Sequence, residues 1–293
     1  MMNGIRELKL ALRALLKRPG FTATAVLTLG LGIGAVTAIF TFVNAILLQP
    51  LPYPESDRIV EVRHHAPAID LPELNNSPGT LAFYREEATW FESITGLSEG
   101  SYVITGTGAD RPEEVSFLLG HPEFFEVFRV APAMGRPIVE SDVVTDAPAV
   151  AILFHDAWQT RYGGDPGILG QTVELDGEPI EIVGVMPEDF IPIEPGPMGL
   201  RPLTRPDEPA FGQFGTAGFA RLADGITLEQ AQARMEALQT QIPDRFPDQI
   251  PAEQLQNFGW AVSTVRLLDE VVEDVVGSLW LVMGTVGGVL LIA

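Results

Sequence analysis

The chain has 293 residues, no cysteine and a formal net charge of −21. So acidic a chain is excluded as a nucleic-acid-binding protein, because phosphates require a basic surface. The absence of thiols excludes a disulfide scaffold and any cysteine-based zinc or redox site, and a hydrophobic content of 46% excludes intrinsic disorder.

Charge is distributed unevenly along the chain. Residues 1–20 carry five basic residues against one acid. Residues 49–274 carry 38 acids and 13 arginines, a net charge of −25, and no lysine. Residues 21–48 and 275–293 carry no charged side chain. This pattern predicts two apolar segments that flank one large acidic domain.

The first apolar segment, residues 21–48, predicts a transmembrane helix. About 20 apolar residues cross the hydrocarbon core of a bilayer, and this run is longer. It is also about twice as long as the apolar core of a signal peptide, and no small-residue cleavage site follows it. Basic residues next to a span stay in the cytoplasm, so residues 49–274 are expected outside the cytoplasmic membrane.

Residues 1–20 have the pattern of an interfacial helix on the cytoplasmic side. Ile5, Leu8, Leu12 and Leu15 recur at helical spacing, and four basic residues form a neighbouring stripe. Such a helix would lie with its leucines in the lipid and its basic side chains toward the headgroups. The alternative is a plain basic flank that only sets the topology.

The second apolar run, residues 275–293, predicts a second transmembrane helix. The chain stops inside this run, which predicts a truncated piece of a longer polytopic protein. The expected order is a cytoplasmic segment (1–20), helix 1 (21–48), a periplasmic core domain (49–274) and a truncated helix 2 (275–293).

Strand and helix signals alternate through residues 49–274, which predicts an α+β domain of two lobes. We expect lobe one at about 49–115 plus 216–274 and an inserted lobe at about 116–215. Asp176-Gly177 predicts a β-hairpin, and Thr227 with Gln230 predicts a capping box at a helix start. Further elements expected from the sequence are strands at 58–62, 101–104, 149–153, 219–222 and 259–268, helices at about 80–93, 122–128 and through Trp158, and a loop at 191–209.

Glycines recur four residues apart in both apolar runs. Gly30 and Gly34 lie in the first run, and Gly284 and Gly288 lie in the second. In lipid, small residues at this spacing let two helices approach closely. These four glycines are therefore predicted helix-packing residues, although glycine is also common in membrane helices without such a contact.

No catalytic, cofactor-binding or metal site is predicted. Gly30-x-Gly32-x-x-Ala35 matches a dinucleotide fingerprint but lies inside a predicted span. Gly96-Leu97-Ser98-Glu99-Gly100 matches a nucleophile elbow, but the residues before it have a helical pattern, so the strand-to-helix order is wrong. There is no phosphate-binding loop. The histidines, at positions 64, 65, 121 and 155, lack metal-ligand spacing and are expected to be solvated or to cap helices.

Several segments together resemble the MacB-type ABC permeases with a periplasmic core domain, in the FtsX-like permease group. They are Leu15-Leu16-Lys17-Arg18-Pro19-Gly20-Phe21-Thr22, Leu29-Gly30-Leu31-Gly32-Ile33-Gly34-Ala35, Leu51-Pro52-Tyr53-Pro54, Phe124-Phe125-Glu126-Val127-Phe128, Trp158-Gln159-x-Arg161-Tyr162-Gly163-Gly164-Asp165-Pro166, Val183-Gly184-Val185-Met186-Pro187-x-x-Phe190 and Ala220-Arg221-Leu222. They follow one another in the same order over essentially the whole chain. In MacB itself an ATPase domain precedes the first span, so the resemblance is to the permease-only branch.

The resemblance implies a permease subunit without chemistry of its own. A separate ABC ATPase in the cytoplasm would hydrolyse ATP, and the spans would carry its motion to the periplasmic domain for efflux or export. The implied setting is the bacterial inner membrane, with the lipid bilayer as a partner and with a second permease copy or a periplasmic adaptor as further partners. Two alternatives stay open, namely a membrane-anchored periplasmic sensor or adaptor without transport, and a membrane-anchored hydrolase.

Overall fold

The computed structural model describes residues 17–20, 22–24, 26–28, 30, 32–34, 37, 51–106, 111–193, 196–269, 284 and 288. The chain divides into two compact units, Leu51–Leu268 and the pair of flanking segments Met1–Pro50 with Asp269–Ala293. The two units are described separately below.

The flanking unit is described at a few positions. Every described position from Pro19 to Thr37 is helical. The Thr24 and Thr28 hydroxyls each donate to the carbonyl four residues earlier, as threonines inside a helix do. Within the described part of the chain, no helix is both long and apolar enough to cross a membrane. Most of the predicted spans, 21–48 and 275–293, lies outside the described residues, and the spans stay predictions.

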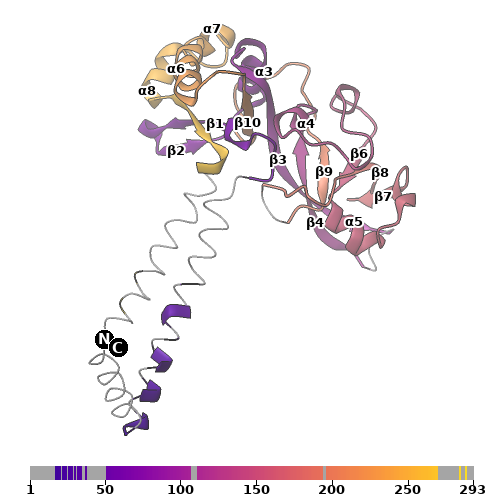
Figure 1. Ribbon diagram of the computed structural model, residues 1–293. Helices are drawn as coiled ribbons and strands as arrows, with labels where there is room; N and C mark the ends of the chain where they lie inside the picture. The colour runs from indigo at the N-terminus through magenta and orange to yellow at the C-terminus, as the bar shows by residue number, and fades with distance from the viewer. Residues whose placement is uncertain are drawn as a thin grey trace. The chain divides into compact units, whose positions relative to one another are not determined.

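The larger unit is a mixed α/β domain built on one sheet (Figure 1). Its strands are β1 (Ile59–Ala66), β2 (Leu71–Leu74), β3 (Phe91–Thr105), β4 (Glu113–Gly120), β5 (Met134–Gly135), β6 (Val150–Leu153), β7 (Thr172–Leu175), β8 (Glu178–Val185), β9 (Gly199–Pro202), β10 (Ala217–Leu222) and β11 (Ala261–Arg266). Its α-helices are α3 (Pro78–Glu87), α4 (Phe124–Val127), α5 (His155–Tyr162), α6 (Leu228–Gln239), α7 (Ile242–Arg245) and α8 (Ala252–Phe258). Short 3₁₀ turns occupy Ser56–Arg58, Pro67–Ile69, Glu140–Asp142 and Pro166–Ile168.

The strand order in the sheet is β11-β1-β10-β3-β4-β9-β6-β8-β5, with β2 beside β1 and β7 beside β3 and β8. The pairs β4–β9 and β6–β8 are parallel, and the other strand pairs among the described residues are antiparallel. The long strand β3 joins the two ends of the sheet. Its first half pairs with β10, and its second half pairs with β4.

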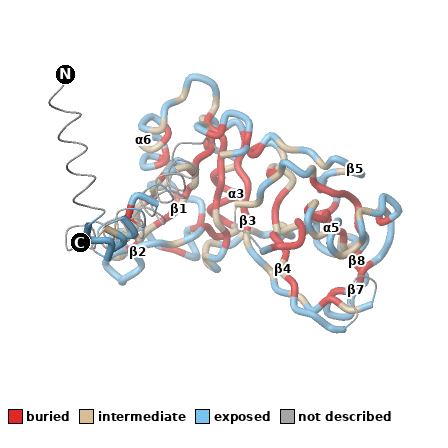
Figure 2. The backbone as a smooth tube through the Cα atoms, turned by 60° about the horizontal axis from the view of Figure 1, so that its bottom comes forward, coloured by how far each residue is buried: buried red, intermediate tan, exposed pale blue. Residues whose placement is uncertain are grey.

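The described buried residues include two hydrophobic cores along this sheet. The first is formed by β1, α3, the start of β3, β10, α6, α7, α8 and β11, with Tyr84 and Met235 fully buried in it. The second is formed by β4, β6, β7 and β8 with their connecting segments, and includes Phe117 and Leu153. Figure 2 shows the buried residues gathered on the strands and on the helix faces that cover them. The predicted lobe boundaries, at 115/116 and 215/216, stay a prediction.

Local sequence signals account for several elements. The Thr227 hydroxyl oxygen accepts a hydrogen bond from the Gln230 backbone N–H, and the Gln230 side-chain oxygen accepts one from the Thr227 backbone N–H, which confirms the predicted capping box at the start of α6. Asp176 and Gly177 have φ values of 53° and 81°, and they connect β7 to β8 as the predicted hairpin. The predicted aromatic helix is α4, and the predicted strand at 149–153 is β6, which is followed by α5.

Two predicted elements are corrected. The helix predicted at 80–93 ends at Glu87, and Phe91 begins β3. Tyr84 and Phe91 are spaced as if they lay on one face of a helix. Both are buried in the first core, but Tyr84 reaches it from α3 and Phe91 from β3. The loop predicted at 191–209 contains β9, between β4 and β6. A Cβ at Gly199 would lie 2.3 Å from the Ile152 carbonyl oxygen, so this glycine lets β9 pack closely.

Candidate functional site

The two ends of the domain lie on neighbouring strands. β1 and β11 pair antiparallel, and Val60, near the start of β1, is the Cα partner of Arg266, the last residue of β11. In an antiparallel pair the start of one strand meets the end of the other. The first strand after residues 51–58 and the last strand of the domain are therefore neighbours in the sheet.

The entry segment, defined as residues 51–58, is anchored by the buried guanidinium of Arg221. Arg221 lies near the end of β10, one residue before Leu222, and is fully buried. Its Nε donates to the Val127 carbonyl at 2.8 Å, and its two terminal nitrogens donate to the Glu55 carbonyl at 3.1 Å and the Pro54 carbonyl at 3.0 Å. The planar guanidinium thus ties the entry segment to both β10 and α4.

Charged side chains form a second layer around the entry segment. The Glu55 carboxylate lies 2.7 Å from both Arg58 and Arg129. Hydrogen bonds from Arg129 and Arg58 lower the pKa of Glu55. Arg58 also pairs with Glu92 at 2.9 Å and with Asp224 at 2.7 Å. Surface pairs of this kind contribute little stability individually, and here they link the segment to Glu92 of β3 and to Asp224, after β10.

Tyr53 connects the entry segment to the loop that follows β8. Its ring is buried and packs edge-on against Phe128 of the α4 end, with the ring centroids 5.0 Å apart. Its hydroxyl donates to the Ile191 carbonyl at 2.5 Å. Burial raises the pKa of the Tyr53 hydroxyl, so it remains a donor at any physiological pH. The entry segment is thereby linked to the end of α4 and to the loop that follows β8.

The exit strand β11 is held by a side chain of α6. The Gln232 amide nitrogen donates to the Val262 carbonyl at 2.9 Å, and its amide oxygen accepts from the Thr264 amide at 2.7 Å. β11 is an edge strand of the sheet, and unpaired edge groups invite pairing with other chains. Gln232 satisfies part of this edge and fixes β11 to the first core.

The four predicted helix-packing glycines are described at their own positions. Gly30, Gly34, Gly284 and Gly288 are all helical. Among the described atoms, a Cβ built at any of the four meets nothing within 4 Å. An added side chain would therefore not clash with this part of the chain, and the predicted contact with another helix stays a prediction.

Two of the four histidines, His64 and His121, are placed differently from the prediction that they are solvated or cap helices. His64 is fully buried, with Nε2 at 2.7 Å from the Tyr84 hydroxyl and its ring stacked on Trp260. Burial lowers the pKa of His64 to about 3. His121 is also buried, and its Nδ1 accepts from the Gly96 amide at 3.3 Å. Desolvation, with Arg205 and Arg85 nearby, lowers its pKa to about 3. Both are neutral core residues.

The described residues also locate the rejected motifs. Gly96 to Gly100 lie within β3, so the residues before Ser98 are a strand and not the helix that the sequence suggested. The helix that a nucleophile elbow needs after the serine is absent there, because β3 continues to Thr105. Across the described ranges, no group of three or more acidic or histidine side chains is arranged to hold a metal ion.

Sequence reasoning did not single out Arg221 or Tyr53 as functional residues. A signal was present for Arg221, which stands between Ala220 and Leu222 in an apolar strand. A charged residue at such a position is rarely buried unless it is paired or fully hydrogen-bonded. Tyr53 had only its place in a proline-rich segment, which gave no hint of its distant partner Ile191.

Comparisons with known proteins agree with this architecture. The domain resembles the crystal structure of a domain of a candidate permease from Porphyromonas gingivalis, with a TM-score of 0.55, 20% identity, and coverage of 73% of this chain and 92% of that one. It also resembles the periplasmic region of MacB from Actinobacillus actinomycetemcomitans, with a TM-score of 0.55, 12% identity, and coverage of 79% and 97%. No curated protein matches the sequence. The profile of the MacB-like periplasmic core domain matches residues 22–238, and the chain therefore belongs to this family of ABC-type permease domains.

Proposed function

We propose that this chain is the permease subunit of an ABC-type transporter and that it works with a separate ATPase. In this proposal residues 21–48 and 275–293 span the inner membrane, the N-terminus lies in the cytoplasm and residues 49–274 lie in the periplasm. The basic residues before Phe21 support the orientation, and membership of the MacB-like family supports the setting.

One observation carries the coupling mechanism. β1 and β11, the strands that join the domain to the two flanking segments, are hydrogen-bonded neighbours, with Val60 opposite Arg266. A relative movement of the two flanking helices would therefore reach the domain at one pair of strands. Arg221 and Tyr53 would pass it on, because they tie the entry segment to α4, β10 and the loop after β8. The output is efflux or export, with a second permease copy or a periplasmic adaptor as further partners.

ATP hydrolysis tests this proposal. The full-length protein purified alone should hydrolyse no ATP. The complex with the ATPase that co-purifies with it should hydrolyse ATP. Substitutions at the entry segment, such as Tyr53→Phe, should reduce the transport output while hydrolysis continues. A protein that binds no ATPase and changes no transport would instead be a periplasmic sensor or adaptor.

A further inference from the structure

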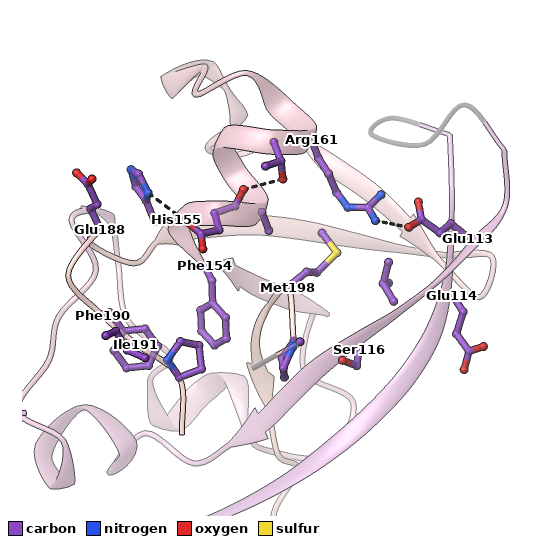
Figure 3. A pocket seen from close by; sticks show the side chains of 17 residues that line it. Glu113, Glu114, Ser116, Phe154, His155, Arg161, Glu188, Phe190, Ile191 and Met198 are labelled. Carbon is purple, nitrogen blue, oxygen red and sulfur yellow. Dashed lines mark hydrogen bonds and ion pairs between the residues drawn. The ribbon is translucent and has the colours of Figure 1, made fainter. Parts of the chain in front are cut away.

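A cavity of about 650 Å³ opens between the start of β4, helix α5 and the loop after β8. Figure 3 shows Phe154 and Met198 pointing into this space, with Phe190 and Ile191 along one wall. Val115, Phe154 and Met198 are buried, so the floor of the cavity is apolar. Its volume lies in the range of small-molecule sites, which are typically apolar with a few polar groups that orient the ligand.

Acidic side chains dominate the rim of this cavity. Glu113, Glu114, Asp156 and Glu188 line it, and Arg161 is the one lysine or arginine among the described residues of its lining. Arg161 donates to Glu113 at 2.8 Å, so the carboxylate of Glu113 balances the positive charge of Arg161. Figure 3 shows this pair on the side of the cavity away from Glu188. Glu114 accepts a hydrogen bond from the Ser101 hydroxyl at 2.6 Å and keeps its charge exposed.

The negative charge of this rim determines which class of ligand the cavity favours. With Arg161 matched by Glu113, the rim leaves the carboxylates of Asp156, Glu188 and Glu114 to face solvent. An anion entering an apolar space beside these carboxylates is repelled, whereas a cation is attracted and can lie over the half-buried ring of Phe190. We propose that this cavity binds a small amphipathic cation, with its apolar body on Phe154 and Met198 and its charged group toward Asp156 and Glu188.

The cavity wall is connected to the entry segment. Phe190 packs on Phe154 and lies near Tyr53, with ring centroids 5.3 Å and 6.3 Å apart. Ile191 accepts the Tyr53 hydroxyl hydrogen bond. A ligand that shifts this wall would therefore act on the same segment that we propose transmits movement. The role of the ligand as cargo rests on the proposed function, but its binding does not.

Binding is measured with the chain in lipid nanodiscs and without any ATPase, so that a failure of coupling cannot affect the result. Three water-soluble probes share one apolar body, namely 4-phenylbutylammonium, 4-phenylbutanol and 4-phenylbutyrate. The cation should bind at least about tenfold more tightly than the alcohol, and the carboxylate should bind weakest. Empty nanodiscs correct for partition of the probes into lipid. Equal affinity for the cation and the alcohol would overturn the proposal.

Variants locate the site. Asp156→Asn and Glu188→Gln should each weaken binding of the cation by about threefold to fivefold and leave the alcohol unchanged. Glu253→Gln, an exposed residue on α8, makes the same charge change far along the chain and should have no effect. Thr160→Trp places a bulky ring at the exposed rim of α5 and should abolish binding of all three probes. Unchanged affinity in Thr160→Trp would show that the probes bind elsewhere.

Discussion

Val60 and Arg266 are Cα partners on the antiparallel strands β1 and β11, 206 residues apart in the sequence. The domain therefore begins and ends on neighbouring strands, and Arg221 of β10 fastens its first residues from the other side of β1. Under the proposed function, movement of the two flanking segments would reach the domain at this pair of strands.

Arg221→Met should strongly destabilise the domain. The substitution removes the donors to the carbonyls of Val127, Glu55 and Pro54 and leaves these groups short of partners. Val127 is buried, and an unsatisfied buried acceptor costs about 1–3 kcal/mol, which is a large part of the stability of a typical domain. Thermal unfolding of the purified chain measures the effect. Arg234→Met, at an exposed position on α6, is the matched control and should unfold near the wild-type temperature.

Acid should destabilise the domain partly through His64. In the unfolded chain a histidine binds a proton below about pH 6.5, whereas burial holds the pKa of His64 at about 3 in the folded domain. Between these values the unfolded state binds more protons, so stability falls as the pH is lowered from 6.5 toward 3. The contribution is about 1.4 kcal/mol per pH unit. His64→Gln, which keeps a hydrogen-bonding side chain beside Tyr84, should show a shallower slope in urea unfolding; an identical slope would contradict the assignment.

Gly34→Leu should weaken assembly of the membrane part with little effect on insertion. The described atoms leave space around Gly34, so the added side chain would interfere with a neighbouring helix and not with its own. Size-exclusion chromatography and co-purification of the tagged permease measure assembly. Ile33→Leu changes the adjacent exposed residue without filling a glycine position, and it should assemble normally. Normal assembly and output of Gly34→Leu would remove the predicted contact.

Salt should stabilise the acidic domain. The net charge of −25 over residues 49–274, with no lysine, produces self-repulsion in the folded state. Raising NaCl from about 0.1 M to about 1 M shortens the Debye length from about 10 Å to about 3 Å and screens this repulsion. The melting temperature of the chain should therefore rise over this range. A melting temperature that stays constant or falls would mean that the acidic surface does not limit stability.

Elements with a local signal could be predicted, and elements held by distant partners could not. The α6 cap and the Asp176-Gly177 hairpin are encoded within a few residues, and both are as predicted. β9 forms by pairing with β4 and β6, which lie far from it in the sequence. The sequence around it is rich in proline, so a loop was predicted there instead of a strand. The burial of His64 likewise depends on Tyr84 and Trp260 from other elements.

The candidate site shows the same division. The charge pattern and the family resemblance predicted an outside domain between two apolar segments. They could not show that the two ends of the domain pair, because the register of β1 with β11 is a contact across 206 residues. They also could not show the cavity, whose walls come from β4, α5 and the loop after β8.

The central claim is that movement enters the domain through both flanking segments. The chain has no cysteine, so a pair introduced at Gln49 and Val275, next to the outer ends of the two predicted spans, would provide its only thiols. Transport output and ATP hydrolysis are measured with the partner ATPase before and after oxidation, and again after reduction. The account predicts that the cross-link stops transport, that hydrolysis continues, and that reductant restores transport. Full cross-linking with unchanged transport would contradict it.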